Sequence, residues 1–376
     1  MEMTRVFGTV ISLLLMFLLA SFLGCEGDQG PEGPQGPPGE PGPPGDPGTL
    51  TPPPDMTFGL AITNNSDYDQ NANTLIKLTF QEDPNPNPAE NTLVGYKLDK
   101  SPILDGQDKG EEDWGTSELY VSEVALTNIR GVDNGIGTMS TPVTLRAGYD
   151  EEYVYFMVKW KEETAGNDDI EFRPGENKFP DRWRYDRDSG TWKQQFNEDQ
   201  LFIYWDISGI DEWDTQGAAL LYHDSDSSIY LDQPGMVDVW HWMAGRTGLI
   251  GYLDDGFVQY DEFVLFDEAN FFGIRPDQGT AAFIANIQDS LPKWMHREDP
   301  NYGGSPPFNM WDATPFDAGA NWDDNATVLG YVIVLPLGSR ADLECNRMGW
   351  AIGFPDHWVV EFRRLRNTGH GDDVQF

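Results

Sequence analysis

Cysteine and basic residues are scarce in this sequence. Its 376 residues include 2 cysteines, Cys25 and Cys345, and no C-x-x-C-H motif, so covalent attachment of a c-type haem is excluded. Lysine and arginine total 24 against 63 aspartates and glutamates, which gives a formal net charge of -39. This charge would repel nucleic acid and anionic membrane surfaces, so neither is expected as a partner.

The common catalytic motifs are missing as well. The sequence contains no G-x-S-x-G, no H-E-x-x-H and no P-loop. The acidic pairs Asp254-Asp255 and Asp372-Asp373 carry the oxygen atoms that calcium prefers, but they lack the spaced ligands of a calcium-binding loop. A catalyst is therefore the least expected class of protein.

Residues 1–25 are typical of a lipoprotein signal peptide. Arg5 precedes an apolar run, and Phe22-Leu-Gly-Cys25 resembles a bacterial lipobox in which Cys25 becomes the lipidated N-terminus. A plain transmembrane anchor is the alternative, because the apolar run is nearly long enough to span a bilayer. Both interpretations predict an exported protein, and the first predicts a lipid anchor in the bacterial cell envelope, facing the periplasm or the outer surface. With Cys25 lipidated, Cys345 has no partner for a disulfide.

Residues 26–57 are a collagen-like and proline-rich linker. Glycine recurs at every third position from Gly27 to Gly48, which is the pattern of a collagen triple helix. A stiff monomeric spacer is favoured over a trimeric stalk, because the repeat is short. Trimerisation through the stalk stays open.

Residues 58–376 are predicted to form an all-β domain, an antiparallel β-sandwich with long loops and a few short helices. Residues 143–150 and 152–160 predict a hairpin, in which Val154, Phe156 and Val158 face one way and Tyr153, Tyr155 and Met157 the other. Residues 161–198 are polar and indicate a long surface excursion.

The stretch from Asn197 to Asp255 carries the candidate site. An expected buried strand, residues 199–206, precedes an apolar run that ends at His223. Trp240, His241 and Trp242 follow. Aromatic walls and an imidazole directed inward are how a pocket for a flat apolar cofactor is built.

This stretch resembles the haem-binding domain of ethylbenzene dehydrogenase gamma subunits, of relatives in the dimethylsulfoxide reductase family and of certain periplasmic cytochromes. The resemblance covers roughly residues 100–376. The segments that carry it best are Asn197-Glu-Asp-Gln-Leu-Phe-Ile-Tyr-Trp, Thr215-Gln-Gly-Ala-Ala-Leu-Leu-Tyr-His, Asp238-Val-Trp-His-Trp-Met-Ala-Gly-Arg-Thr-Gly248 and Asp254-Asp255. The cytochrome-like branch has cysteines where this chain has Ala218 and Tyr222, so the resemblance implies haem without thioether bonds.

The resemblance implies a non-covalent haem b with His223 as one axial ligand. Met236 is the expected second ligand, and Met243 and Met295 are alternatives. Met243 stands where lysine is commoner in the family. The expected cofactor-binding residues are thus His223, Met236, Trp240, His241 and Trp242, with His223 and Met236 on the metal.

Two functions are consistent with these residues. The first is non-catalytic electron transfer to redox partner proteins through the haem. The second is a binding module that uses surface tryptophans for a glycan or a protein partner. The candidate tryptophans, which suit either function, are Trp160, Trp183, Trp192, Trp205, Trp240 and Trp242.

Overall fold

The structure is a computed structural model, and its contacts divide the chain into a unit Met1–Thr49 and a unit Leu50–Phe376. It describes residues 52–63, 74–82, 92–114, 120–127, 139–161, 182–195, 199–224, 228–231, 233–244, 246–251, 253–260, 274–276, 283–297, 308–324, 326–334, 343–346 and 357–376. The predicted signal peptide, Cys25 and the collagen-like repeat lie outside these residues. None of the described helices has the length and apolar composition that a membrane span requires.

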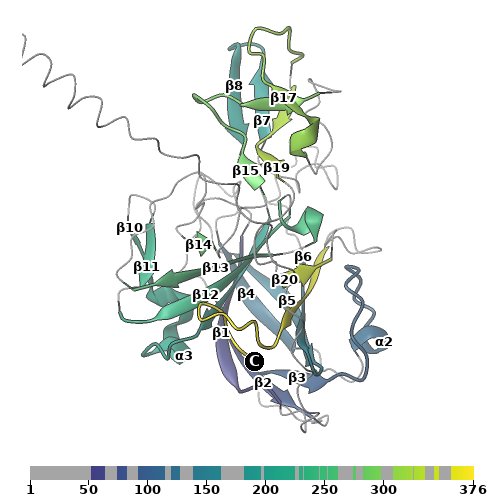
Figure 1. Ribbon diagram of the computed structural model, residues 1–376, viewed down its shortest axis with the longest axis vertical. Coiled ribbons are helices and arrows are strands. Elements are labelled where there is room, and N and C mark those ends of the chain that lie inside the picture. The colour runs from purple at the N-terminus through teal and green to yellow at the C-terminus, as the bar shows by residue number, and fades with distance from the viewer. Residues whose placement is uncertain are drawn as a thin grey trace, which may run out of the picture. The chain divides into compact units, whose positions relative to one another are not determined.

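The second unit is built on a twelve-stranded sheet of described strands (Figure 1). In chain order these strands are β1 (Met56–Thr63), β2 (Thr74–Gln81), β3 (Thr92–Lys97), β4 (Tyr120–Thr127), β5 (Met139–Tyr149), β6 (Tyr153–Lys161), β9 (Gln200–Asp206), β12 (Met236–Met243), β13 (Asp254–Gln259), β14 (Arg275–Pro276), β20 (Leu343–Cys345) and β21 (His357–Leu365). Their order in space is β14-β13-β12-β9-β1-β2-β3-β5-β6-β21-β20, and β4 pairs with both β1 and β5. The all-β prediction is confirmed, although three described pairs (β1 with β4, β2 with β3, β3 with β5) are parallel.

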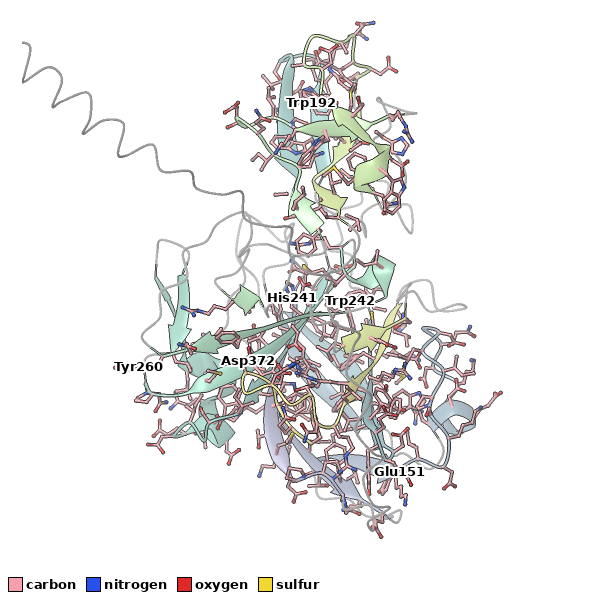
Figure 2. All side chains as sticks on the ribbon, in the orientation of Figure 1. Glu151, Trp192, His241, Trp242, Tyr260 and Asp372 are labelled. Atoms are coloured by element: carbon pink, nitrogen blue, oxygen red, sulfur yellow. The ribbon has the colours of Figure 1, made fainter. Side chains whose placement is uncertain are left out.

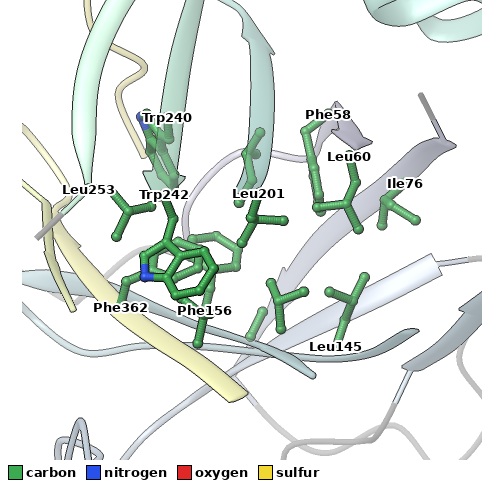
Figure 3. Packing of buried hydrophobic residues seen from close by; sticks show 14 of the residues in the cluster. Phe58, Leu60, Ile76, Leu145, Phe156, Leu201, Trp240, Trp242, Leu253 and Phe362 are labelled. Atoms are coloured by element: carbon green, nitrogen blue, oxygen red, sulfur yellow. The ribbon is translucent and has the colours of Figure 1, made fainter. Parts of the chain in front are cut away.

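The sheet folds over its own apolar face. Four strands separate β9 from β6 in the sheet order, yet Phe156 of β6 lies 5.9 Å from both Trp205 of β9 and Trp240 of β12, measured between ring centroids. Figure 3 shows Trp240, Trp242 and Leu201 on one side of this core and Phe156, Phe362 and Leu145 on the other. Two layers of strands therefore enclose one core, as in a β-sandwich.

The side chains of the central strands are buried on both faces. Val154, Phe156 and Val158 of β6 join the main core, whereas Tyr155 and Met157 pack with Trp114 and Val359 on the opposite face. The predicted hairpin is confirmed as β5 and β6, which pair antiparallel from Val143↔Trp160 to Tyr149↔Val154. The period-two alternation of this segment was a sufficient signal, because successive side chains of a strand point to opposite faces.

Shorter strands form small sheets of their own. They are β7 (Arg182–Asp186), β8 (Thr191–Gln195), β10 (Leu221–Asp224), β11 (Ser228–Leu231), β15 (Phe283–Ala285), β16 (Trp294–His296), β17 (Ala313–Pro315), β18 (Thr327–Leu329) and β19 (Tyr331–Ile333). We call β7, β8 and β15 to β19 the insert region. Its hairpin β7–β8 lies within the predicted surface excursion, but Trp183 and Trp192 are buried in a core of their own with Trp322 and Val328.

The described helices are short, as expected. They are the α-helices α2 (Glu111–Trp114) and α3 (Trp213–Gln216) and the 3-10 helices η2 (Gly217–Leu220), η3 (Gly248–Ile250) and η4 (Met310–Asp312). The apolar run before His223 is therefore not one strand. It begins as η2 at Gly217, whose φ of 54° suits glycine, and continues as β10.

Candidate functional site

Strand β12 carries four of the five predicted cofactor-binding residues, and it divides them between its two faces. It pairs with β9 on one side and β13 on the other. Trp240 and Trp242 point into the main core, whereas Val237 and Val239 belong to a second apolar cluster on the opposite face. His241 alternates with the two tryptophans, so the three residues do not form one wall. Figure 2 labels His241 and Trp242 near the same end of the strand.

Trp240 and Trp242 are packed inside the core. The ring centroid of Trp240 lies 4.9 Å from that of Trp205 and 5.9 Å from that of Phe362. The ring of Trp242 lies 5.0 Å from Trp358 and 5.9 Å from Trp160. Gly248 also abuts Trp242, because a Cβ there would stand 2.6 Å from the indole Nε1. These side chains contact one another, so they do not line a slot for a porphyrin.

His241 is a buried neutral imidazole. Its Nε2 lies 2.7 Å from Oε1 of Gln200, and its ring stacks on Phe202 at a centroid distance of 4.0 Å. Burial, together with the charge of Arg246, holds the pKa of His241 well below its ordinary value. With one nitrogen in a hydrogen bond and one ring face covered, His241 fits a structural role better than that of a haem ligand.

Met236 and His223 lie on elements that meet at one corner of the main sheet. Met236 is half-buried at the start of β12, and its backbone N–H donates to Oγ of Ser208 at 2.7 Å. His223 lies on β10, opposite Ile229 of β11; its side chain lies outside the described part of the structure. Leu231 at the end of β11 bridges Tyr260, which directly follows the partner of Met236 in β13.

The two alternative methionines occupy different surroundings. Met243 ends β12 and is buried, and its backbone N–H donates to Oγ1 of Thr247 at 3.0 Å. Met295 packs partly buried in the core of the insert region with Trp183 and Trp192. The position of Met295 is that of an apolar filler, which is the commonest role of methionine in a core.

A buried ionic cluster next to Trp240 is absent from the sequence-based expectations. Nη1 of Arg364 on β21 lies 2.8 Å from Oδ2 of Asp238, and its Nη2 lies 3.1 Å from Oδ2 of Asp255 and 2.9 Å from Oδ2 of Asp373. We call these four residues the Arg364 cluster. The side chains of Arg364, Asp238 and Asp373 are 0% exposed, and that of Asp255 is 2% exposed.

Further groups fix the Arg364 cluster to the core. The Trp240 indole N–H and the Val374 backbone N–H donate to Oδ2 of Asp238 at 3.2 and 2.7 Å. Burial raises the pKa of Asp238, although the charge of Arg364 opposes this rise. Burial also disfavours the charged guanidinium, but the three carboxylates hold the pKa of Arg364 above its ordinary value. An aspartate between two valines, in a strand of otherwise apolar and aromatic residues, is the sequence signal for this cluster, because lone charges are seldom buried.

The tryptophans proposed as a binding surface are buried. Trp160, Trp183, Trp205, Trp240 and Trp242 are 3% exposed or less, and Trp192 is 9% exposed. Stacking on a glycan at the surface requires an exposed ring, so these residues do not supply that platform. Among the described tryptophans, Trp311 on η4 is the exposed one, at 56%.

A comparison with models of known protein families agrees with the resemblance seen in the sequence. Residues 121–376, more than half of the chain, match the family model described as Ethylbenzene dehydrogenase. No curated protein sequence matches this chain.

Proposed function

Because this chain belongs to the ethylbenzene dehydrogenase family, we propose that it is a redox protein that binds haem b non-covalently and transfers electrons. His223 of β10 and Met236 of β12 would hold the haem iron. Trp240, His241 and Trp242, with their side chains committed to the folded core or to Gln200, support the strand that carries Met236.

The observation that supports this pair is the joined corner of the sheet. Tyr260 bridges Leu231 of β11, and its backbone N–H donates to the carbonyl of Gly235, the residue before Met236, at 3.1 Å. In Figure 1 the hairpin β10–β11 lies beside β12 and β13. Two short connections thus link the hairpin of His223 to the start of β12, and imidazole and thioether are known haem ligands.

A haem supplies one-electron chemistry, and a histidine–methionine pair favours a raised reduction potential. In this proposal His223 and Met236 would bind the iron, and the hydrogen bond from the Met236 backbone N–H to Oγ of Ser208 would orient the start of the strand. The family comprises subunits of oxidoreductases, and we propose that this domain serves as an electron carrier for a redox partner protein rather than as the catalytic part.

The proposal includes export and a lipid anchor at Cys25, because the apolar leader, the lipobox-like cysteine and the Gly-X-Y repeat follow one another directly. The repeat then serves as a stiff spacer between membrane and domain. Mass spectrometry of the mature N-terminus tests this part. A diacylated Cys25 is expected, and an unmodified residue upstream of Cys25 would contradict it.

Haem reconstitution of the purified protein tests the cofactor. We expect a Soret band in the wild type that is lost in His223→Ala. His241→Ala is the matched control, because it also removes an imidazole but not a proposed ligand of the iron. The Soret band of this variant should persist. A colourless wild type, or loss of the band in His241→Ala but not in His223→Ala, would contradict the proposal.

A further inference from the structure

We propose that residues 99–114 form a pH-sensitive strap, which covers the outer face of β6 and β21 at acidic pH and opens more often as the pH rises. The carboxylate of Glu361 on β21 controls the opening. The strap lies on the face of the sheet opposite the main core, so this device does not depend on the proposed haem.

Glu361 binds the strap directly. The backbone N–H groups of Asp105 and Gly106 donate to its Oε2 at 3.0 and 2.8 Å, and the indole N–H of Trp114 donates to its Oε1 at 3.4 Å. All three donors lie on the strap, about 250 positions before Glu361 in the sequence, and Glu361 is 0% exposed. The strap is therefore what both holds this carboxylate and covers it.

The groups around Glu361 leave its carboxylate without a cation. In β6 its register partner is the apolar Met157, and in β20 the neutral amide of Asn346 accepts from the backbone N–H of Glu361 at 2.7 Å. The charged side chains of the strap and the adjacent strands pair with one another: Lys109 with Asp105 and Asp113, Arg146 and Lys159 with Asp108, and Arg363 with Glu344. Among the described residues, none of these cations forms an ion pair with Glu361. A negative charge on Glu361 is thus compensated by hydrogen bonds alone.

The strap packs outside the main core. Trp114 at its end joins a small cluster of apolar side chains on the outer face, namely Leu98, Tyr155, Met157 and Val359. In contrast, Phe156 and Phe362 of the same two strands point into the main core. Opening of the strap would therefore uncover the outer face of β6 and β21 and leave the main core closed.

The burial of Glu361 sets the direction of the pH effect. Burial raises the pKa of Glu361 to about 7 while the strap is closed, and the charge of Asp105 adds to this rise, although the three N–H donors oppose it. When the strap opens, the carboxylate reaches water and its pKa returns to its ordinary value of 4.5. Between these two values the open state holds fewer protons, so the equilibrium constant for opening rises about tenfold per pH unit, or about 300-fold in total.

Hydrogen exchange of the full-length protein, corrected for the intrinsic exchange rate of each amide, tests the strap. The amides of Asp105 and Gly106 report on it directly, because they donate to Glu361. Their protection in the wild type should fall about 70-fold between about pH 5 and about pH 8. Strands β9 and β12 should stay better protected than the strap throughout, because they belong to the main core. Equal protection of the strap and these strands would show that the strap opens only with the whole domain, which would overturn the proposal.

Two variants identify the group that titrates. Glu361→Gln carries no charge at any pH, so the protection of its strap should not change with pH beyond the intrinsic rate. Glu344→Gln is the matched control, because it removes an exposed carboxylate of the neighbouring strand and should keep the wild-type profile. A wild-type strap that is equally protected at both ends of the pH range would overturn the proposal, whether or not Glu361→Gln folds. A wild-type profile in Glu361→Gln would overturn it as well.

Discussion

The main sheet and the insert region each contain a buried polar side chain, but they stabilise it by different interactions. The main sheet buries a guanidinium among three carboxylates at Arg364. The insert region buries a neutral amide, Asn286, which is 0% exposed. Its Nδ2 donates to the carbonyls of Trp294 and Leu329 at 2.9 and 2.7 Å, and its Oδ1 accepts from the backbone N–H groups of Lys293 and Trp294.

The difference concerns what each region requires of its surroundings. An amide is satisfied by hydrogen bonds alone, and Asn286 fills all four of its positions with backbone groups from nearby turns and strands. A buried charge needs a counter-charge, and residues 238, 255, 364 and 373 meet only once the sheet has formed. The stability of the main sheet should therefore depend on its buried charges and on pH, whereas the stability of the insert region should not.

Removal of the buried guanidinium should have the largest effect on stability. Arg364→Met leaves Asp238, Asp255 and Asp373 without their arginine, and breaking a buried ion pair on one side costs about 3–5 kcal/mol. Urea unfolding measures the free energy lost. Arg363→Met is the matched control, because Arg363 is an adjacent arginine paired with the exposed Glu344, and its loss should cost about 0–1 kcal/mol. Equal costs for both variants would contradict the account.

Glu361 should make the main sheet sensitive to pH. It is fully buried, and burial raises its pKa to about 7, although the backbone N–H groups of Asp105 and Gly106 donate to it. The folded state thus holds a proton more tightly than the unfolded state, so this stabilisation is complete below pH 4.5 and is lost as the pH rises through about 7. Glu361→Gln, which mimics the protonated acid, should remove about 3 kcal/mol of this pH dependence.

The control for this experiment is Glu344→Gln, which alters an exposed carboxylate on the neighbouring strand. Stability curves of the wild type and both variants from acidic to mildly alkaline pH decide the point. Parallel curves for the wild type and Glu361→Gln would show that Glu361 is not the group that titrates.

Asn286→Ala should have a smaller effect that stays within the insert region. The variant leaves four backbone groups without their partner, and we expect a loss of about 2–3 kcal/mol there. Amide hydrogen exchange should accelerate in β15, β18 and β19 but not in β9 or β12. Asn367→Ala, at an exposed position, should change neither set of strands. Equal acceleration in both regions would show that they unfold as one unit.

Patterns in the sequence predict individual strands better than they predict how the short strands pair. Alternation over residues 153–160 and the apolar run at 200–206 identify β6 and β9, because the two faces of each strand differ in what they contact. Strands β16, β17 and β18 have three residues each, which is too short for a period-two pattern to be recognised. Their sheet pairs form through tertiary contacts that no local pattern records.

The candidate site was predicted only in part, for two physical reasons. Period-two alternation requires Trp240 and His241 to face opposite sides of β12, so a single Trp-His-Trp wall contradicts the strand on which it lies. The Arg364 cluster contains residues up to 135 positions apart, and even its closest pair in the sequence is nine residues apart. No local spacing pattern therefore predicts it. The axial pair His223 and Met236 stays a prediction.

Spectroelectrochemical titration of the haem-reconstituted protein, measured beside Met236→His, tests the central claim most directly. If His223 and Met236 bind the iron, the wild type takes up one haem, and replacing the thioether by a second imidazole lowers its reduction potential by on the order of 0.1 V. A wild type that takes up no haem, or a potential that Met236→His leaves unchanged, would contradict the account.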